Sequence, residues 1–177
     1  LVGSEMCIRD RIRVTDRVWA GEPSSTVAAE DCLALAAIVH GGREAIERDP
    51  VLFANVNVNS PLRFDGRMLE GLFAYAAAGQ AIIVTPFLLM GAMAPVAVPA
   101  ALVQQTVEAL AGIALVQLIR PGTPSVMGSF LSTTDMKTGS PAFGGPESAF
   151  GLYASGQLAR RLGLPWRSGG GTLTASP

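Results

Sequence analysis

Charged residues are scarce in this sequence. Asp, Glu, Lys and Arg make up 15% of its 177 residues, hydrophobic residues make up 49%, and the net charge is -1. A complete domain of this size carries about 25% charged residues. With fewer charges, this chain is expected to have apolar surface that a membrane or a missing part of a larger globular protein buries. Because the sequence has no basic stretch, we expect no nucleic-acid partner.

Soft metal ligands are also scarce. We interpret residues 1–11, "LVGSEMCIRDR", as an artefact, because they lack periodicity and resemble the translated adapter that contaminates environmental shotgun reads. Past this segment only Cys32 and His40 remain, and zinc needs three or four converging ligands, so no metal site is predicted. A single cysteine forms no internal disulfide, which favours a reducing cytoplasm.

Charge is absent from Gly71 to Val107, and the stretch 81–103 is long enough to span a bilayer. Pro86, Pro95 and Pro99 interrupt it and would leave backbone carbonyls unpaired in lipid. No Lys/Arg cluster flanks the stretch as a topology signal. A buried strand, a loop and a buried helix explain this stretch better than a membrane span, which is the less favoured alternative.

Short apolar runs alternate with helical patterns along the chain. Predicted strands lie at 52–58, 81–85, 125–127 and 164–167. Predicted helices lie at 25–39, 66–79, 98–122 and 145–163, with a shorter helical turn before Pro50. Strands that alternate with helices and are apolar throughout are typical of a parallel sheet covered by helices.

The connections are asymmetric in length. Helix-to-strand connections are short, whereas the strand-to-helix connections at 59–65, 86–97, 128–145 and 168 onwards are long. Barrels build their active sites from that second set of loops. No GxGxxG follows the first strand, so a dinucleotide site is not supported. The predicted fold is therefore α/β, a partial (β/α)8 TIM barrel with about four parallel strands alternating with helices.

Five long motifs resemble the trimethylamine methyltransferase family, the corrinoid-dependent methylamine and quaternary-amine methyltransferases. They are "NVNSPLRFD", "TPFLLMGAMAPV", "QQTVEALAGIALVQLIRPGTP", "GSFLSTTDMKTGSPAFGGPE" and "SGQLARRLGLPWRSGGG". The family fold is a (β/α)8 barrel, so the resemblance implies that residues 12–177 are the central part of such a barrel, truncated at both ends. It also implies transfer of a methyl group from trimethylamine or a betaine-like quaternary amine to Co(I).

The resemblance places the cofactor, cobalamin, on a separate corrinoid protein and not on this chain. Partners would then be that corrinoid protein and a small methylated amine, with no nucleic acid and no membrane, and a homo-oligomer of the full-length protein stays open. The absence of a non-standard residue favours quaternary amines over pyrrolysine-dependent trimethylamine chemistry. The alternative function is a non-catalytic barrel that binds betaine-like solutes, and a membrane-protein fragment is less favoured.

Asp135 and Lys137 lie in the 128–145 segment and are the predicted catalytic residues. Asp135 would offer negative charge to a cationic substrate, and Lys137 would pair with a carboxylate of the substrate or of the protein. The alternative is a solvated turn pair, since Asp, Gly and Pro are ordinary turn residues.

The remaining candidates are predicted to bind substrate. Asn57 and Asn59 end the first strand on one face, where satisfied core amides are the alternative. Glu147 begins a helix, where the helix dipole alone explains an acidic residue. Arg167 would hold a carboxylate tail.

Aromatic residues fall at or just beyond the predicted strand ends. These residues are Phe87, Phe130, Phe143 and Trp166. Aromatic faces attract quaternary ammonium groups through the ring quadrupole, so an aromatic box is a reasonable prediction. Ordinary aromatic packing beneath long loops is the alternative. An in-line methyl transfer needs positioning and exclusion of water more than acid/base groups, which fits the lack of a catalytic triad.

Overall fold

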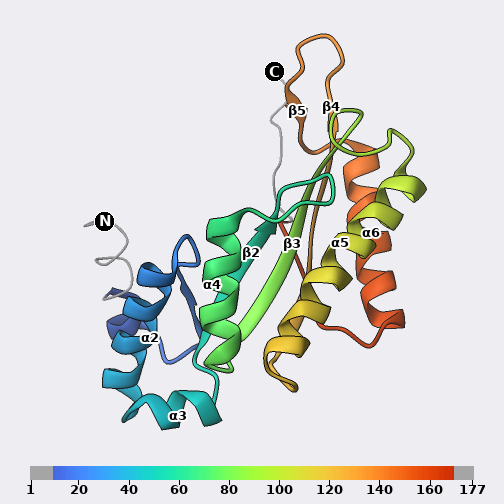
Figure 1. The fold of residues 1–177 in the computed structure, drawn as a ribbon. Coiled ribbons are helices and arrows are strands. Elements are labelled where there is room, and N and C mark those ends of the chain that lie inside the picture. The colour runs from blue at the N-terminus through green and yellow to red at the C-terminus, as the bar shows by residue number, and fades with distance from the viewer. Residues whose placement is uncertain (1–9, 170–177) are drawn as a thin grey trace. The chain divides into compact units, whose positions relative to one another are not determined.

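The protein folds as strands and helices in alternation, in a computed structural model that describes residues 10–169 (Figure 1). The elements in chain order are β1 (Trp19–Gly21), α2 (Thr26–His40), α3 (Arg43–Arg48), β2 (Leu52–Val58), α4 (Gly66–Ala77), β3 (Ala81–Met90), α5 (Val98–Ile119), β4 (Ser125–Thr134), β5 (Pro141–Ala142), α6 (Pro146–Arg161) and β6 (Trp166–Ser168). The predicted α/β class is confirmed.

The strands form one sheet in the order β1-β2-β3-β4-β5, with β6 also paired to β4. β1 and β2 are parallel, with Trp19 opposite Leu52, and β4 and β6 are parallel, with Met127 opposite Trp166. The short β5 runs antiparallel to β4, with Ala142 opposite Thr133. Within residues 10–169 the sheet is open and does not close into a barrel.

Two strands extend further than the sequence predicted. β3 was expected to end at Thr85, but it continues through Pro86 to Met90. A proline removes one ladder hydrogen bond, yet it does not prevent alternate residues from packing, and Leu88 and Met90 are both buried. β1 and β5 were not predicted, because strands of three and two residues leave little pattern.

The segment 128–145 was predicted to be a connection, which is wrong for residues 128–134 and 141–142, because they form strands. β4 continues to Thr134, and the chain then turns back to pair as β5. The close approach of β4 to β3 requires glycine at position 128. An added Cβ would lie 2.6 Å from the Val84 carbonyl oxygen and 2.8 Å from Thr85 Cα. The polar Ser/Thr run after Leu131 is compatible with a strand, since threonine favours extended backbone.

Side-chain caps begin two of the helices. Ser25 caps α2 by accepting a hydrogen bond from the Ala28 N–H at 3.1 Å, and Asp65 caps α4 by accepting one from the Arg67 N–H at 2.8 Å. Pro146 occupies the first turn of α6, with Glu147 beside it and two arginines in the last turn.

The stretch 81–103 forms a strand, a loop and the first residues of α5, which confirms the favoured prediction over a single span. Among the described residues, α5 is the one helix whose length and apolar composition would suffice to cross a membrane. Core helices of soluble proteins can have the same length and composition.

The chain forms two compact units. Unit 1 contains the described residues of Leu1–Val56, Asp65–Ile83 and Ala114–Ser125. Unit 2 contains Asn57–Phe64, Val84–Ile113 and the described residues of Val126–Pro177. The described residues that follow β2, β3, β4 and β6 before the next helix therefore fall in unit 2, apart from Asp65. The residues between β1 and α2 belong to unit 1, and a common rim for the later connections stays a prediction.

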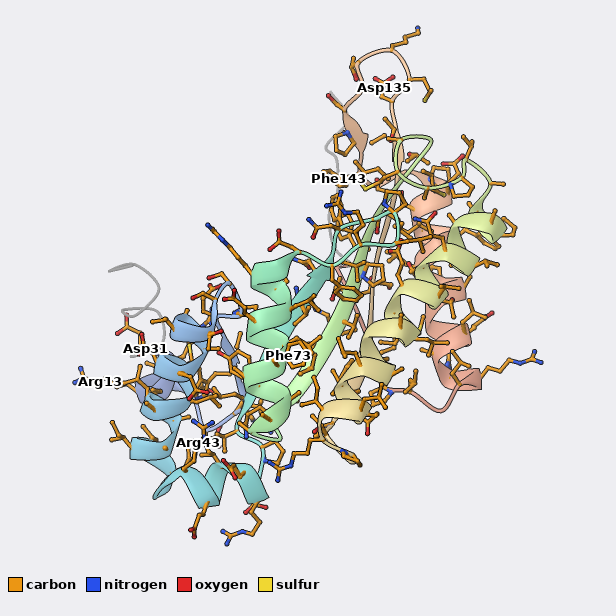
Figure 2. All side chains as sticks on the ribbon, viewed as in Figure 1. Arg13, Asp31, Arg43, Phe73, Asp135 and Phe143 are labelled. Atoms are coloured by element: carbon orange, nitrogen blue, oxygen red, sulfur yellow. The ribbon has the colours of Figure 1, made fainter. Side chains whose placement is uncertain are left out.

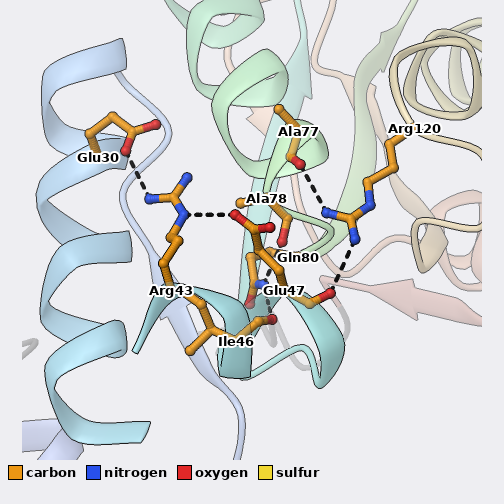
Figure 3. Close-up of polar contacts among 8 residues, drawn as sticks. All are labelled: Glu30, Arg43, Ile46, Glu47, Ala77, Ala78, Gln80 and Arg120. Atoms are coloured by element: carbon orange, nitrogen blue, oxygen red, sulfur yellow. Dashed lines mark hydrogen bonds and ion pairs between the residues drawn. The ribbon is translucent and has the colours of Figure 1, made fainter. Parts of the chain in front are cut away.

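A buried amide and a partly buried guanidinium group organise unit 1 (Figure 3). The Gln80 side chain is fully buried; its oxygen accepts from the Val51 and Leu52 N–H groups, and its nitrogen donates to the Ile46 and Ala78 carbonyls. Arg120 donates to the Ala77 and Glu47 carbonyls at 3.0 and 3.2 Å.

Unit 2 has an apolar core between strand and helix. Its buried members are Leu88, Met90, Ala101, Leu102 and Leu131, with Ala94, Val98, Ala154 and Leu158 packed against them. The core thus joins β3 and β4 to α5 and α6, and it fixes which side chains of these strands face the helices.

Candidate functional site

Three phenylalanines from separate segments form one cluster in unit 2. The rings of Phe87 in β3 and Phe130 in β4 are stacked, with centroids 4.7 Å apart and an interplanar angle of 16°. Phe143, just after β5, meets Phe130 edge-on at 5.7 Å and 79°. All three residues were predicted from the sequence to bind substrate, and the structure brings them together.

The cluster lies on the face of the strands that is turned away from α5 and α6. The next residues along the strands, Leu88 and Leu131, belong to the core shared with those helices. Because successive strand side chains point to opposite faces, Phe87 and Phe130 point the other way. In a barrel, that face is the interior, and both residues lie in the carboxyl-terminal halves of their strands.

Glycines allow the backbone to approach this cluster closely. A Cβ on Gly169, at the end of β6, would lie 2.6 Å from Cδ2 of Phe130. Gly128, in β4, similarly leaves no room for a side chain against Val84 and Thr85. A larger residue at position 169 would therefore displace the Phe130 ring, whereas one at position 128 would push against the backbone of β3.

Trp166 does not join the phenylalanine cluster. Its indole Nε1–H donates to Ser129 Oγ at 3.0 Å, and its ring lies 3.3 Å from where a Cβ on Gly156 of α6 would be. The predicted aromatic box thus divides into the phenylalanine cluster and a separate tryptophan packed against α6.

A hollow of about 750 Å³ runs beside these residues. Phe130, Phe143 and Trp166 line it, together with α6 residues from Ser148 to Arg160. The helix rises about 18 Å between positions 148 and 160, far more than the length of a small methylated amine. Only the end bounded by Phe130 and Phe143 therefore belongs to the candidate site.

Asp135 and Lys137 lie at the exposed tip of the β4–β5 hairpin, and Phe143 lies nearer its base (Figure 2). The Asp135 carboxylate accepts hydrogen bonds from the Lys137 N–H and the Thr138 hydroxyl, both at 2.9 Å. The Asp135 N–H donates to the Ser140 carbonyl at 2.8 Å. These bonds place Asp135 in a hydrogen-bonded turn, as the alternative interpretation expected. A catalytic role for Asp135 and Lys137 stays a prediction.

The pKa of the Asp135 carboxyl lies below its usual value. The largest cause is the hydrogen bond from the Lys137 N–H, followed by the bond from the Thr138 hydroxyl. Both donors stabilise the charged form, so Asp135 keeps its negative charge at neutral pH.

The remaining predicted residues take separate positions. Asn57 and Asn59 are exposed where β2 ends, and the Asn59 N–H donates to the Arg63 carbonyl at 2.7 Å. Glu147 lies exposed in the first turn of α6, as the helix dipole favours. Arg167 is exposed in β6, in register with Gly128 of β4.

The chain matches the trimethylamine methyltransferase (MTTB) family over residues 5–177. It belongs to that family. The predicted resemblance is therefore confirmed. Residues 1–9 of the predicted adapter segment lie outside the described residues, and its origin stays a prediction.

Three relatives show the range within the family. The chain is 44% identical over 160 residues to a glycine betaine methyltransferase of Desulfitobacterium hafniense (strain Y51), covering 90% of this chain and 33% of the relative. It is 33% identical over 129 residues to a proline betaine:corrinoid methyltransferase of Eubacterium limosum, covering 72% and 27%. It is 31% identical over 125 residues to trimethylamine methyltransferase MttB1 of Methanosarcina acetivorans, covering 71% and 25%. The chain thus spans a third or less of the length of these relatives.

Sequence analysis missed one buried carboxylate in this family member. Glu108 of α5 is 2% exposed and accepts three hydrogen bonds from neutral donors. A signal was present, because Glu108 is the only charged residue between Gly71 and Ile119. A lone charge in an apolar helix must be satisfied locally, which marks it for attention.

The described residues contain no cluster of metal-ligating side chains. No group of three or more His, Cys, Asp or Glu residues among them could hold a metal ion. Cys32 is a buried free thiol whose sulfur accepts from the Glu22 N–H at 3.4 Å.

Proposed function

We propose that the full-length protein transfers a methyl group from a quaternary amine such as a betaine to the Co(I) centre of a separate corrinoid protein in the cytoplasm. The observation that carries this proposal is the cluster of Phe87, Phe130 and Phe143. Rings within about 6 Å of a cation attract it electrostatically, and a methylated ammonium group presents its charge through methyl groups that also pack well on rings. The names of the two betaine-converting relatives support the same substrate class.

We further propose that the full-length protein closes into a (β/α)8 barrel. Support comes from the alternating order of strands and helices and from the parallel pairs β1-β2 and β4-β6. In that fold the phenylalanine cluster would face the barrel interior near the carboxyl ends of the strands, where barrel enzymes bind their substrates.

The corrinoid, carried by the partner protein, supplies the cobalt that accepts the methyl group. The residues of this chain hold and orient the amine. When a methyl group leaves a quaternary nitrogen, the bonding electron pair stays with nitrogen, and the nitrogen is neutral until it takes up a proton from water. The rings therefore attract the substrate nitrogen more strongly than the product nitrogen as first formed, which favours product release.

The anionic end of a betaine requires a separate contact. Arg167 and Lys137 are our candidates for its carboxylate, since both are exposed cations in unit 2. Asp135 stays our candidate for an additional contact to the ammonium group, reached from the hairpin tip. Asn57, Asn59, Glu147 and Trp166 complete the proposed set of contacts at the mouth.

The decisive test offers glycine betaine, proline betaine and trimethylamine to the full-length protein with its corrinoid partner. Methylation of the corrinoid is followed by its absorbance spectrum, and binding of each amine is followed by calorimetry. Methyl transfer from at least one betaine supports the proposal. Binding without transfer would favour a barrel that sequesters betaine-like solutes, and neither binding nor transfer would overturn both proposals.

The role of Asp135 has its own test in the same assay. We expect Asp135→Ala to raise the KM for the amine if its charge contacts the substrate. Thr138→Val, which disturbs the same turn but leaves the carboxylate, is the matched control. Undiminished turnover by Asp135→Ala would remove Asp135 from the site.

A further inference from the structure

The buried carboxylate of Glu108 links α5 to the β2–α4 connection. Its Oε2 accepts from the Ser60 hydroxyl at 2.6 Å, and its Oε1 accepts from the Leu62 N–H at 2.8 Å. The Gln104 side-chain amide, one helical turn away, donates to the same Oε1 at 3.0 Å. All these residues belong to unit 2.

The group that Glu108 holds is in an unfavourable backbone conformation. Leu62 has a φ of 55°, the left-handed region that a bulky residue rarely adopts. Its side chain is 67% exposed, so apolar packing does not compensate for that conformation. Such a residue persists only where its surroundings fix it, and the Glu108 carboxylate supplies the fixed partner for its N–H.

Gln104 extends the link to a second connection. Its Nε2 also donates to the Met93 carbonyl at 3.1 Å, in the segment between β3 and α5. The Gln104–Glu108 pair therefore joins the connection after β2 to the connection after β3. Both connections begin at strand ends that we assign to the mouth of the site.

One face of α5 is adapted to this contact. Gly112 lies a further turn along the helix, and a Cβ there would be 3.0 Å from Cζ of Phe64 and 2.7 Å from Cγ1 of Val84. Residues four apart lie on the same face of a helix, so 104, 108 and 112 form one stripe beneath the 57–64 connection. Polar bonds and close packing along this stripe hold the same loop.

We propose that Gln104 and Glu108 are positioning residues that set the two mouth loops for substrate binding. The proposal rests on the proposed function, because it assigns the loops to a methylated-amine site. Glu108 touches no substrate; it acts through Ser60 and Leu62, and so through the placement of Asn57 and Asn59.

The experiment compares variants of the full-length protein in two assays. Glu108→Ala should raise the KM for the favoured amine at least about 10-fold, because small displacements of binding groups reduce binding strongly. Glu108→Gln should stay within about 3-fold of wild type, because its amide oxygen can still accept from the Leu62 N–H and its nitrogen can donate to Ser60.

Gln105→Ala is the matched control. Gln105 is equally buried on the same helix, but its amide donates to Ser155 of α6 at 2.8 Å and not to a mouth loop. We expect this variant to lower Tm without changing KM. If Glu108→Ala lowers Tm and leaves KM unchanged, Glu108 is merely structural and the proposal is overturned.

Hydrogen exchange provides a readout that needs no activity. Gln104→Ala should speed exchange in both the 59–64 and 91–97 segments, whereas Gln105→Ala should not. This variant also replaces Glu108→Ala if the latter fails to fold, and unchanged exchange in both segments would overturn the proposal. Faster exchange in a protein that transfers no methyl group would leave the positioning role intact and refute only the proposed function.

Discussion

Phe130 contacts both other members of the phenylalanine cluster, so a single substitution there tests the site most directly. Phe130→Leu keeps apolar bulk but removes the ring quadrupole. We expect the KM for a quaternary amine to rise about 2- to 30-fold, the range that a cation–ring contact of about 0.5 to 2 kcal/mol supports. Phe150→Leu on α6, where the ring is 59% exposed, is the control and should have no effect. An unchanged KM for Phe130→Leu would refute ammonium binding by this cluster.

Asp135 gives a prediction about pH. Its folded pKa is lowered, so its hydrogen bonds stabilise the hairpin tip above the ordinary carboxyl pKa and are lost as pH falls through the lowered value. Thr138→Val removes one donor and should raise the Asp135 pKa towards its ordinary value. Titration of the Asp135 carboxyl by NMR measures both values, and identical pKa values in the two proteins would contradict the assigned cause.

At the scale of elements, the approach of β3 and β4 depends on Gly128. In Gly128→Ala, the new methyl group would meet backbone atoms of Val84 and Thr85, which cannot move as a side chain can. We expect a loss of about 1–3 kcal/mol in the free energy of unfolding, typical of overpacking. The measurement is denaturant unfolding of the full-length protein.

Gly66→Ala is the control for that substitution. Gly66 begins α4, and nothing lies within 4 Å of an added Cβ there. Alanine is the better helix former, so this change should be neutral or stabilising. If both variants lose the same free energy of unfolding, the close approach at Gly128 does not explain the loss.

The order of helices and strands was predictable because burial and periodicity are local signals. β2 was predicted with its observed bounds, and the predicted helices 25–39 and 145–163 match α2 and α6 to within two residues at each end. The extensions of β3 and β4 were missed because Pro86 and Gly128 are usually strand breakers, and only tertiary packing makes them acceptable.

The site was partly predictable for the same reason. Phe87, Phe130 and Phe143 fall at or beyond the predicted ends of strands, and neighbouring strands bring such positions together. The link from Glu108 to Leu62 joins residues 46 positions apart, and its pairing depends on tertiary structure that no local pattern reports. The composition of the sequence marked Glu108 as unusual but could not name its partners.

At the scale of the whole molecule, large apolar side chains remain exposed. Val27, Ile38, Val103, Leu118 and Tyr153 are each between 65% and 82% exposed. The sheet of the described residues also has open edges, which expose unpaired backbone groups. Exposed apolar side chains and bare sheet edges both favour association.

We therefore predict that the 177-residue chain expressed alone is insoluble or molten. It should bind a hydrophobic dye and show no cooperative thermal transition, whereas the full-length protein should melt cooperatively. Calorimetry and dye fluorescence measure both properties. A cooperative melt of the isolated chain would contradict this prediction.

The turn at the hairpin tip offers a place to attach a fluorophore. Asp135 and Thr138 close that turn, while the Met136 side chain between them is 78% exposed. A thiol-reactive label on Met136→Cys would discriminate against the buried Cys32, once Cys7 is replaced by serine. A change in emission from that position on adding the proposed corrinoid partner would locate the hairpin tip near the docking surface.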